Sequence, residues 1–511
     1  MSNFVYKNPV IPGFNPDPSI CRVGGDFYLV TSTFEFFPGV PVYHSKNLVN
    51  WEMIGHCLTR DSQLPLGGCP ASGGIFAPTL RHHDGIFYMT TTNVSHKGNF
   101  IVHTHDIQGE WSEPVWIDQK GIDPSLLFED DKVYFCSNGG MNGEPGIYMC
   151  ELNPVSGEIY TESRLISNGC GGRYPEAPHV YKWNGRYYLM LAEGGTEYGH
   201  MVTIQRSKSP YGPYEPCPHN PILSHRDNTG ALDIECTGHA DIIEDNLGNW
   251  WMVSLGVRPL SPNGNKVLLH NLGRETFLSP LHWDEQGWPQ VGNNGKISIA
   301  MQAKLPEPVR ENKIDVLYDF TGESLNREFT YIRNPDKPRY HIDNTESCLV
   351  MDGGDVSLSE DGKSPTFAGV RQKDFEVEAA VHVRLCECAD RGQAGISVYY
   401  NHEHHCEILI SQSGRQNYIC LNRRIYDLEV TISRVPVQSD AVYLKIISGH
   451  DYYSFYYSFD GQAYVLLDRA SSMAFCSEIT RKMTFTGTFL GLYAVSAKAK
   501  FSCFSVKTIN L

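Results

Sequence analysis

A pattern that recurs five times between residues 17 and 255 restricts how this chain can fold more than any other feature. Each copy starts with a small residue or Asp, continues through an aliphatic stretch and a turn containing Gly or Asp, and ends in an aromatic-rich segment. A strand, a tight turn and a second strand rich in Tyr, Phe and Trp predict a β-hairpin. The copies are DPSICRVGGDFYLVTS from Asp17, APTLRHHDGIFYMTTT from Ala77, DPSLLFEDDKVYFCSN from Asp123, APHVYKWNGRYYLMLA from Ala177 and ADIIEDNLGNWWMVSL from Ala240.

The spacing of the hairpins indicates a β-propeller. Consecutive copies begin 60, 46, 54 and 63 residues apart, which leaves room for two further strands in each unit. Three hairpins are followed by strand-like segments that end near an aromatic residue, namely HSKNLVNWE, HTHDIQGEWSEP and RSKSPYGPYEP. We therefore predict five four-stranded blades, with a generic β-sandwich as the alternative for this region.

The length of the chain predicts a second domain. Single hydrophobic cores stop growing at about 250 to 300 residues, and this chain has 511. The repeat ends before a Pro- and charge-rich stretch at 306–313, which we interpret as a linker between a propeller at 1–305 and a second domain at 314–511. Alternating strands such as DFEVEAAVHVRL, and a hairpin turn at Asp460 and Gly461, predict an antiparallel β-sandwich there.

A histidine-rich run in the second domain, His402 to Glu407, raises the question of a metal site. Its spacing fits no standard site, and period-two alternation puts the histidines on both faces of a strand. We expect a solvated turn.

The charge balance does not favour nucleic acid or an anionic membrane as a partner. Lys and Arg number 42 against 58 Asp and Glu, a formal charge of −16, and no basic cluster stands out. The N-terminal residues show no signal-peptide pattern, and no segment approaches the roughly 20 apolar residues of a membrane span. The 15 cysteines lack CxxC spacing and lie in apolar contexts, so we expect buried free thiols in a cytoplasmic protein.

The five copies differ at their first two positions in a way that points to a functional site. Asp17 and Asp123 occupy the first position, where the other copies have Ala, and Glu176 and His239 stand immediately before it. Innermost strands of a propeller line its axis, so these four side chains should converge. Carboxylates gathered in an apolar ring are costly, because each repels the others and loses water. A turn-forming Asp before Pro and a solvated Glu are the structural alternatives.

Glycoside hydrolysis is a reaction that uses such a group of carboxylates. An inverting enzyme needs one carboxylate to take a proton from water and one carboxylic acid to protonate the leaving oxygen. A third carboxylate that stays ionised would raise the pKa of the acid by repulsion, as burial also does.

The motifs resemble glycoside hydrolase family 43, in its β-xylosidase and α-L-arabinofuranosidase branch. They are NPDPSICRVGGDFYLVTSTFEFFPGVPVYHSKNLVNW, GIFAPTLRHHDGIFYM, GIDPSLLFEDD, PEAPHVYK, CTGHADII and GRETFL, and they extend the resemblance over nearly the whole chain. The resemblance implies an inverting enzyme with Asp17 as general base, Asp123 as the modulating and orienting aspartate and Glu176 as general acid. It also implies a lectin-like jelly roll for the second domain.

Further site residues follow from the same resemblance. Arg274 in GRETFL matches an arginine that holds the modulating aspartate and a sugar hydroxyl, and a guanidinium there would keep Asp123 ionised. A surface salt bridge is the alternative for Arg274. His239 matches a histidine on the propeller axis that lies beside a calcium ion bound mostly by water in many relatives. No cofactor is required, and a hydrogen-bonded core histidine is the alternative.

Three aromatic residues are expected around the sugar. Phe34 and Phe76 resemble the aromatic wall of the family, and Phe485 in FTGTFLG resembles a loop residue that closes the pocket from the second domain. Phe76 is often Trp in similar enzymes, and PEAPH replaces the commoner Glu-Gly-Pro-His. These departures affect the expected sugar preference more than the reaction.

The sequence as a whole predicts an exo-acting inverting glycosidase that releases xylose from the non-reducing end of β-1,4-xylo-oligosaccharides. Release of α-L-arabinofuranose, alone or in addition, is the alternative within the same mechanism. A non-catalytic carbohydrate-binding protein is the remote alternative. The expected partner is a small oligosaccharide, and the resemblance suggests a homo-oligomer.

Overall fold

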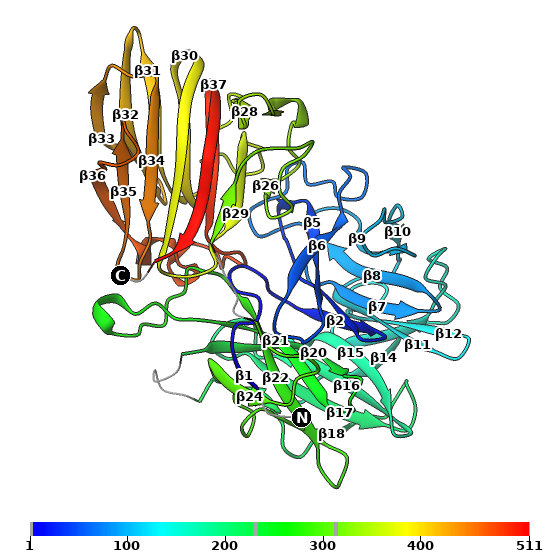
Figure 1. The fold of residues 1–511 in the computed structure, drawn as a ribbon. Coiled ribbons are helices and arrows are strands. Elements are labelled where there is room, and N and C mark those ends of the chain that lie inside the picture. The colour runs from blue at the N-terminus through cyan, green and yellow to red at the C-terminus, as the bar shows by residue number, and fades with distance from the viewer. Residues whose placement is uncertain (1–3, 228–232, 311–314, 510–511) are drawn as a thin grey trace.

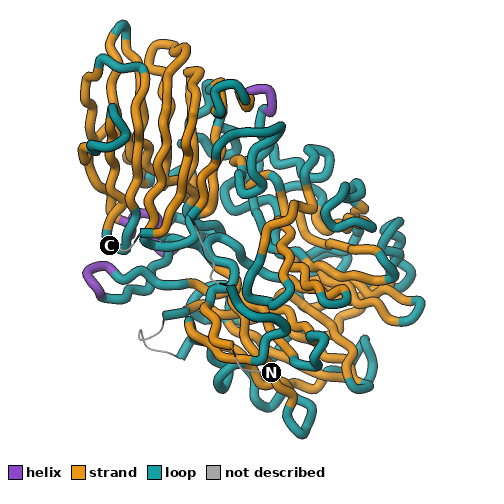
Figure 2. The backbone as a smooth tube through the Cα atoms, viewed as in Figure 1, coloured by secondary structure: helices purple, strands orange, loops and turns teal. Residues whose placement is uncertain are grey.

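The computed structural model describes residues 4–227, 233–310 and 315–509, and these residues form a protein built from β-strands (Figures 1 and 2). The N-terminal sheets, blue to green in Figure 1, lie beside a C-terminal domain of long strands, yellow to red. Helical structure in the described residues is limited to four 3-10 turns, η1 (Pro262–Gly264), η2 (Lys337–Arg339), η3 (Ser472–Phe475) and η4 (Ser477–Ile479). None of the helical segments in this part of the chain has the length and hydrophobicity to span a membrane.

Five antiparallel sheets, each with at least four strands, form the blades of a propeller, as the repeat predicts. In every blade the first two strands are one of the five predicted hairpins, and the later strands come from the segments between them. Blade 1 contains β2 (Ser19–Val23), β3 (Asp26–Val30), β5 (Gly39–Ser45) and β6 (Glu52–Leu58), and blade 2 contains β7 (Thr79–His83), β8 (Ile86–Asn93), β9 (Gly98–Thr104) and β10 (Val115–Trp116). Blade 3 contains β11 (Ile122–Glu129), β12 (Lys132–Asn138), β13 (Ile147–Glu151) and β14 (Arg164–Ser167). Blade 4 contains β15 (Glu176–Trp183), β16 (Arg186–Glu193), β17 (Met201–Ser207), β18 (Glu215–Pro216) and the additional β19 (Leu223–Ser224), and blade 5 contains β20 (Glu235–Glu244), β21 (Trp250–Val257), β22 (Glu275–Trp283) and β23 (Pro289–Val291).

The first strands of the blades close into a ring around the axis. β2 contacts β7, β7 contacts β11, β11 contacts β15, β15 contacts β20, and β20 returns to β2. The N-terminal segment supports this closure, because β1 (Phe4–Lys7) pairs with β24 (Ala300–Ala303), and the amides of Val10 and Ile11 donate to the carbonyl of Thr276 in blade 5. The five-bladed propeller is therefore confirmed.

Each interface between neighbouring blades has its own hydrophobic cluster. Cys21, Val30 and Leu80 belong to the cluster between blades 1 and 2, and Trp251 and Leu29 belong to the one that joins blade 5 back to blade 1. The remaining three interfaces are filled in the same way. A single blade cannot bury its apolar faces alone, so this packing explains why the five repeats fold as one unit.

The C-terminal domain is a β-sandwich whose layers are connected by two long strands. β30 (Val377–Asn401) pairs with β37 (Phe489–Thr508) along most of its length. The first half of β30 also pairs with β34 (Ala441–Ile447), and its second half pairs with β31 (His404–Ser413). A large apolar core fills the interior, which confirms the predicted antiparallel β-sandwich. The other strands of this sheet are β25 (Val316–Tyr318), β27 (Tyr340–Asp343), β28 (Cys348–Asp352), β29 (Phe367–Arg371), β32 (Gln416–Ile425), β33 (Leu428–Val437), β35 (Tyr452–Ser458) and β36 (Val465–Ser471), and the predicted turn at Asp460 and Gly461 joins the last two as a hairpin.

The two domains make direct backbone contacts in addition to the covalent linker between them. β26 (Tyr331–Ile332), which follows the predicted linker, pairs with β4 (Phe36–Phe37) of the propeller. The linker predicted at 306–313 is described only in part, because residues 311–314 lie outside the described residues. Its first part lies on blade 1, where the side-chain amides of Asn47 and Asn50 donate to the carbonyls of Pro308 and Arg310.

The prediction of a solvated turn at His402 to Glu407 is wrong for most of that run. His404, His405 and Glu407 are buried in the first half of β31, and His402 and Glu403 lie in the preceding turn. The strand lies between β30 and β32, and a loop covers its outer face, so that Ser359 Oγ lies 3.2 Å from His405 Nε2. Alternation alone could not reveal that both faces are covered.

The cysteines follow the sequence prediction with two exceptions. All 15 lie in the described residues as free thiols, and most of them are buried or half-buried. Cys386 and Cys503 are exposed, which the apolar sequence around Cys503 did not suggest.

We expect Gly121→Ala to destabilise the propeller strongly. Gly121 precedes β11 at φ +90°, and an added Cβ would lie 1.7 Å from the carbonyl oxygen of Asn138. Left-handed strain and overpacking together predict a loss of about 3 kcal/mol or more. Gly185→Ala is the matched control, because Gly185 also has a positive φ, +73°, but open space around its Cβ position, so only about 1 kcal/mol is expected. Calorimetric melting of both variants measures the difference, and equal losses would contradict this packing.

Candidate active site

The starts of the inner strands surround a cavity of about 240 Å³. Every side chain that the sequence analysis assigned to the site lines this cavity. Four of the five blades contribute charged or imidazole groups, and the sandwich domain contributes one aromatic ring. The predicted convergence is therefore observed. The side chains are Asp17, Phe34, Phe76, Asp123, Glu176, His239, Arg274 and Phe485.

The backbone turns sharply where the inner strands begin. Asp17, Asp123, Ala177 and His239 have φ values of 56°, 55°, 50° and 41°, in the left-handed region that residues other than glycine rarely adopt. The pairing register of β11, β15 and β20 is irregular at the same places. Such strained residues persist only where surrounding contacts hold them, and here they bring the polar side chains to the cavity.

Asp17 is held by three polar neighbours. Arg274 Nη1 donates to Asp17 Oδ1 at 2.9 Å, and Ser32 Oγ donates to Oδ2 at 2.5 Å. His239 Nδ1 lies 3.6 Å from Oδ1. Burial alone would raise the pKa of Asp17, but the charges of Arg274 and His239 and the Ser32 hydrogen bond lower it below its usual value. Asp17 is therefore ionised at neutral pH.

The pKa of Glu176 is shifted in the opposite direction from that of Asp17. Burial, reinforced by the negative charge of Asp17, raises the pKa of Glu176 to about 7. Glu176 begins β15 and faces the same cavity as Asp17. The pocket thus holds one ionised carboxylate and one carboxyl group that retains its proton near neutral pH.

Asp123 resembles Glu176 rather than Asp17 in its electrostatics. Burial, then the charges of Glu176 and Asp17, raise the pKa of Asp123 well above its usual value. Its carboxyl group accepts a hydrogen bond from the amide of Ala177, the residue after Glu176. This contact connects Asp123 to the backbone that positions Glu176.

Arg274 is bonded to a different aspartate from the one expected. The sequence-based expectation pairs Arg274 with Asp123, whereas in the structure its guanidinium binds Asp17, and the Thr196 hydroxyl accepts from the same Nη1 at 2.9 Å. Arg274 directly precedes β22, in the blade adjacent to blade 1, whereas Asp123 belongs to blade 3. The carboxylate that stays ionised and helps to raise the pKa of Glu176 is accordingly Asp17.

Three phenylalanine rings form one wall of the cavity. The ring centroids of Phe34, Phe76 and Phe485 lie 5.2 to 5.9 Å apart, and the Arg274 guanidinium lies 5.5 Å from both Phe34 and Phe485. Phe485 comes from the sandwich domain, and its amide donates to the Ser72 hydroxyl of the propeller at 3.0 Å. The second domain therefore contributes to the wall of the cavity, and its closure of the pocket stays a prediction.

Several lining residues were missed by the sequence analysis. Thr196 and Glu197 lie in the loop after β16, and His200, which is buried, donates from Nδ1 to the carbonyl of Cys236 at 3.0 Å. The repeat could have indicated this loop, because Phe34, which was selected from the sequence, follows the second strand of blade 1 just as Thr196 follows the second strand of blade 4. Nothing in the sequence indicated Met483, because only the contact between the two domains brings its side chain to the cavity.

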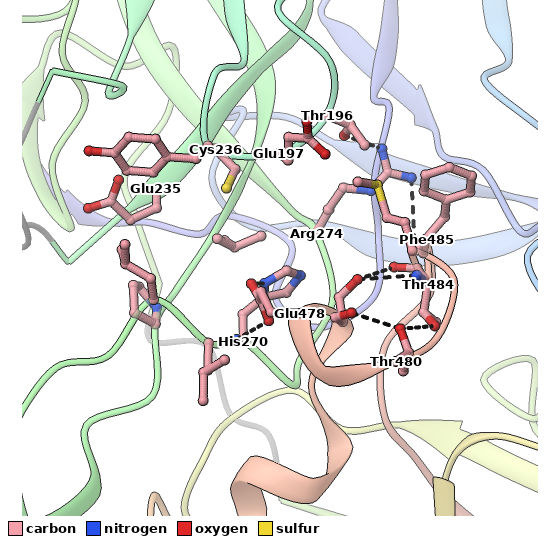
Figure 3. Close-up of a pocket in the computed structure, with 17 residues that line it drawn as sticks. Thr196, Glu197, Glu235, Cys236, His270, Arg274, Glu478, Thr480, Thr484 and Phe485 are labelled. Atoms are coloured by element: carbon pink, nitrogen blue, oxygen red, sulfur yellow. Dashed lines mark hydrogen bonds and ion pairs between the residues drawn. The ribbon is translucent and has the colours of Figure 1, made fainter. Parts of the chain in front are cut away.

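A second cavity of about 480 Å³ adjoins the first between blade 5 and the sandwich domain (Figure 3). Figure 3 shows Arg274 between Thr196 and the chain at Phe485, with the hydrogen-bonded pair His270 and Glu478 nearby. The cavities share Arg274, Thr196, Glu197, Met483 and Phe485. A ligand in either cavity would thus contact the same guanidinium.

The residues around His239 do not form an evident calcium site. Calcium prefers six to eight oxygen ligands, and His239 faces Asp17, whose oxygens are already bonded to Arg274 and Ser32. Among the described residues, no group of three or more His, Cys, Asp or Glu side chains is arranged to hold a metal ion. The calcium expectation therefore finds no support in this donor set.

Comparison with known protein families agrees with this geometry. Residues 6–289 match the model of glycosyl hydrolases family 43, and residues 317–507 match the beta xylosidase C-terminal concanavalin A-like domain. The chain belongs to glycosyl hydrolases family 43. This family 43 protein is thus a glycoside hydrolase, not a non-catalytic carbohydrate-binding protein.

Its relatives act on two kinds of pentoside. The chain is 39% identical to a non-reducing end alpha-L-arabinofuranosidase of Bacteroides ovatus, over 96% of this chain and 91% of the relative. It is 35% identical to a xylosidase/arabinosidase of Butyrivibrio fibrisolvens, over 96% of both. A solved family 43 structure from a Bacteroides ovatus xyloglucan locus has a TM-score of 0.92 at 38% identity, covering 99% of this chain and 100% of that one. A xylan beta-1,4-xylosidase structure from Bacillus halodurans has a TM-score of 0.91 at 31% identity, covering 98% and 100%.

We expect kcat/KM of this family 43 enzyme to fall as the pH rises through about 7, where Glu176 loses its proton. Arg274→Met should move the rising limb at lower pH, where Asp17 loses its proton, to higher pH, because the Arg274 charge lowers the pKa of Asp17. The measurement is the pH dependence of kcat/KM on an aryl glycoside. Arg206→Met, a change in blade 4 outside the pocket, is the control and should leave the rising limb in place. A rising limb that does not move in Arg274→Met would contradict this electrostatic assignment.

Proposed function

We propose that the protein is an exo-acting inverting glycosidase that releases xylose from the non-reducing end of β-1,4-xylo-oligosaccharides. The observation that carries this proposal is the opposite protonation of Asp17 and Glu176 within one pocket. Two carboxyl groups with separated pKa values supply a general base and a general acid at the same pH.

The proposed mechanism is a single displacement. The ionised Asp17 removes a proton from a water molecule as the water oxygen attacks the anomeric carbon. The glycosidic bond breaks in the same step, and Glu176 gives its proton to the departing oxygen. The product sugar then has the opposite anomeric configuration. Asp123 orients the Glu176 segment through the amide of Ala177.

The shape of the pocket supports cleavage at a chain end. Phe34 and Phe76 offer ring faces to the apolar side of a sugar, and Phe485 closes the pocket from the sandwich domain. A polysaccharide could not pass through a pocket closed in this way, whereas the end of a short chain could enter it. The acidic overall charge is compatible with a neutral oligosaccharide.

Release of α-L-arabinofuranose is the second candidate, and a specific observation favours it. The relative at 39% identity is a non-reducing end alpha-L-arabinofuranosidase, and another at 35% is described as a xylosidase/arabinosidase. Phe76 stands where similar enzymes often have the larger Trp, which leaves more room in the aromatic wall. One active site could therefore accept both terminal pentoses.

Two aryl glycosides separate these candidates. We expect hydrolysis of an aryl β-D-xyloside, of an aryl α-L-arabinofuranoside or of both, and the ratio of kcat/KM values gives the preference. Proton NMR of xylobiose hydrolysis should show α-xylose as the first product released from the non-reducing end. Failure to hydrolyse either glycoside would contradict the pentosidase proposal, and initial release of β-xylose would contradict inversion.

Conservative variants test the two carboxyl roles. Asp17→Asn should reduce kcat by about 10²- to 10⁴-fold with every leaving group, because water activation is lost. Glu176→Gln should reduce kcat by a similar factor with alkyl or sugar leaving groups but far less with dinitrophenyl, which needs little protonation. Glu35→Gln is the control, because Glu35 is buried with a pKa raised to about 7 yet does not line the pocket. If Glu176→Gln lost activity equally with all leaving groups, Glu176 would not be the acid.

A further inference from the structure

One half-buried arginine crosses the centre of the propeller. Arg81 belongs to β7 of blade 2, yet its guanidinium contacts Ser19 of blade 1, His179 of blade 4 and Asp241 of blade 5. A side chain from one inner strand reaches three other inner strands only by extending across the axis. Arg81 is therefore the cation at the centre of the ring.

The partner carboxylate, Asp241, is fully saturated with donors. Its Oδ2 accepts from Ser19 Oγ at 2.7 Å, the amide of Ile20 at 3.1 Å and Arg81 Nη1 at 2.8 Å. Its Oδ1 accepts from Tyr181 Oη at 2.6 Å, the amide of Ile242 at 2.9 Å and Arg81 Nη2 at 3.3 Å. Burial by itself would raise the pKa of Asp241, but Arg81 and the other donors hold it far below its usual value. Asp241 stays charged and has no free oxygen for a metal ion.

The network reaches the proposed catalytic groups through very short stretches of chain. Ser19 lies two residues after Asp17, His179 three after Glu176, and Asp241 two after His239. These are the places where the backbone is left-handed or the strand register is irregular. Contacts at Ser19, His179 and Asp241 thus hold the strained starts of three inner strands.

We propose that Arg81 is a positioning residue that takes the place of a metal ion on the propeller axis. Its guanidinium bridges Asp241 and His179 and fixes the strands that carry Asp17, Glu176 and His239. A divalent cation would meet the positive charge of Arg81 and no vacant carboxylate oxygen. The enzyme accordingly needs no bound metal. The catalytic part of this inference rests on the proposed roles of Asp17 and Glu176.

Metal content and stability test the first half on the full-length enzyme. We expect elemental analysis after gel filtration to find no stoichiometric calcium or other divalent metal. The melting temperature should be the same in EDTA and in calcium chloride. Stoichiometric metal, or a melting temperature that EDTA lowers and calcium restores, would overturn the proposal. These measurements need no substrate, so they remain decisive even if the protein hydrolyses neither aryl pentoside.

Variants of Arg81 test the positioning role. Arg81→Ala should lower kcat about 100-fold with little change in KM, because the proton-transferring groups lose their alignment while the aromatic pocket remains. Guanidinium added at millimolar concentration should restore part of the lost kcat by filling the vacated place. The control is Arg206→Ala, which removes a guanidinium stacked 3.9 Å from the Trp288 ring in the outer part of the propeller. It should reduce the melting temperature without a comparable fall in kcat or any rescue.

Arg81→Lys keeps the test conclusive if Arg81→Ala does not fold. It retains the charge that neutralises Asp241, but one ammonium group cannot reproduce the paired contacts to Asp241 and His179. We expect a folded protein with reduced kcat and unchanged KM. Wild-type kcat in Arg81→Lys, or a loss in Arg81→Ala that matches Arg206→Ala and is not rescued by guanidinium, would show that Arg81 has only a structural role.

Discussion

The ion pair between Asp17 and Arg274 is the interaction on which the rest of the site depends. It joins the first blade to the last, and the same guanidinium reaches Thr196 of blade 4 and the carbonyl of Phe485 in the sandwich domain. Without this cation, burial would raise the pKa of Asp17, as it does for Asp123 and Glu176. One guanidinium thus makes a buried carboxylate different from its neighbours.

The ionised state of Asp17 has a second consequence, because its charge raises the pKa of Glu176. Its negative charge adds to the effect of burial and keeps the Glu176 proton in place near neutral pH. Base and acid properties therefore arise from one set of charges rather than from two separate environments. Among three carboxyl groups placed by one repeat, Asp17 differs from Asp123 and Glu176 because its carboxylate is bonded to Arg274.

The scaffold explains how such a costly cluster is tolerated. Hydrophobic clusters at every blade interface stabilise the ring. The inner strands place residues with left-handed backbone near the axis, where hydrogen bonds to polar side chains accompany the irregular strand pairing. The sandwich domain completes the enclosure through Phe485 and through the short pairing of β26 with β4. Burial of the carboxyl groups, and hence their raised pKa values, depends on both domains.

The amino-acid sequence was sufficient to predict the blades and the sandwich, because these follow from local periodicity. It also predicted the convergence of Asp17, Asp123, Glu176 and His239, because equivalent positions of a repeat meet at the axis of a propeller. It was not sufficient for contacts between residues far apart in the chain. Alternation could not show that both faces of β31 are covered, so His404 and His405 were wrongly expected in solvent. The repeat could not tell which aspartate Arg274 binds, since blade 5 neighbours blade 1 only when the ring closes. Nor could it show that Arg81 crosses the axis to Asp241, because the partners of a buried charge depend on which side chains the closed fold brings within hydrogen-bonding distance.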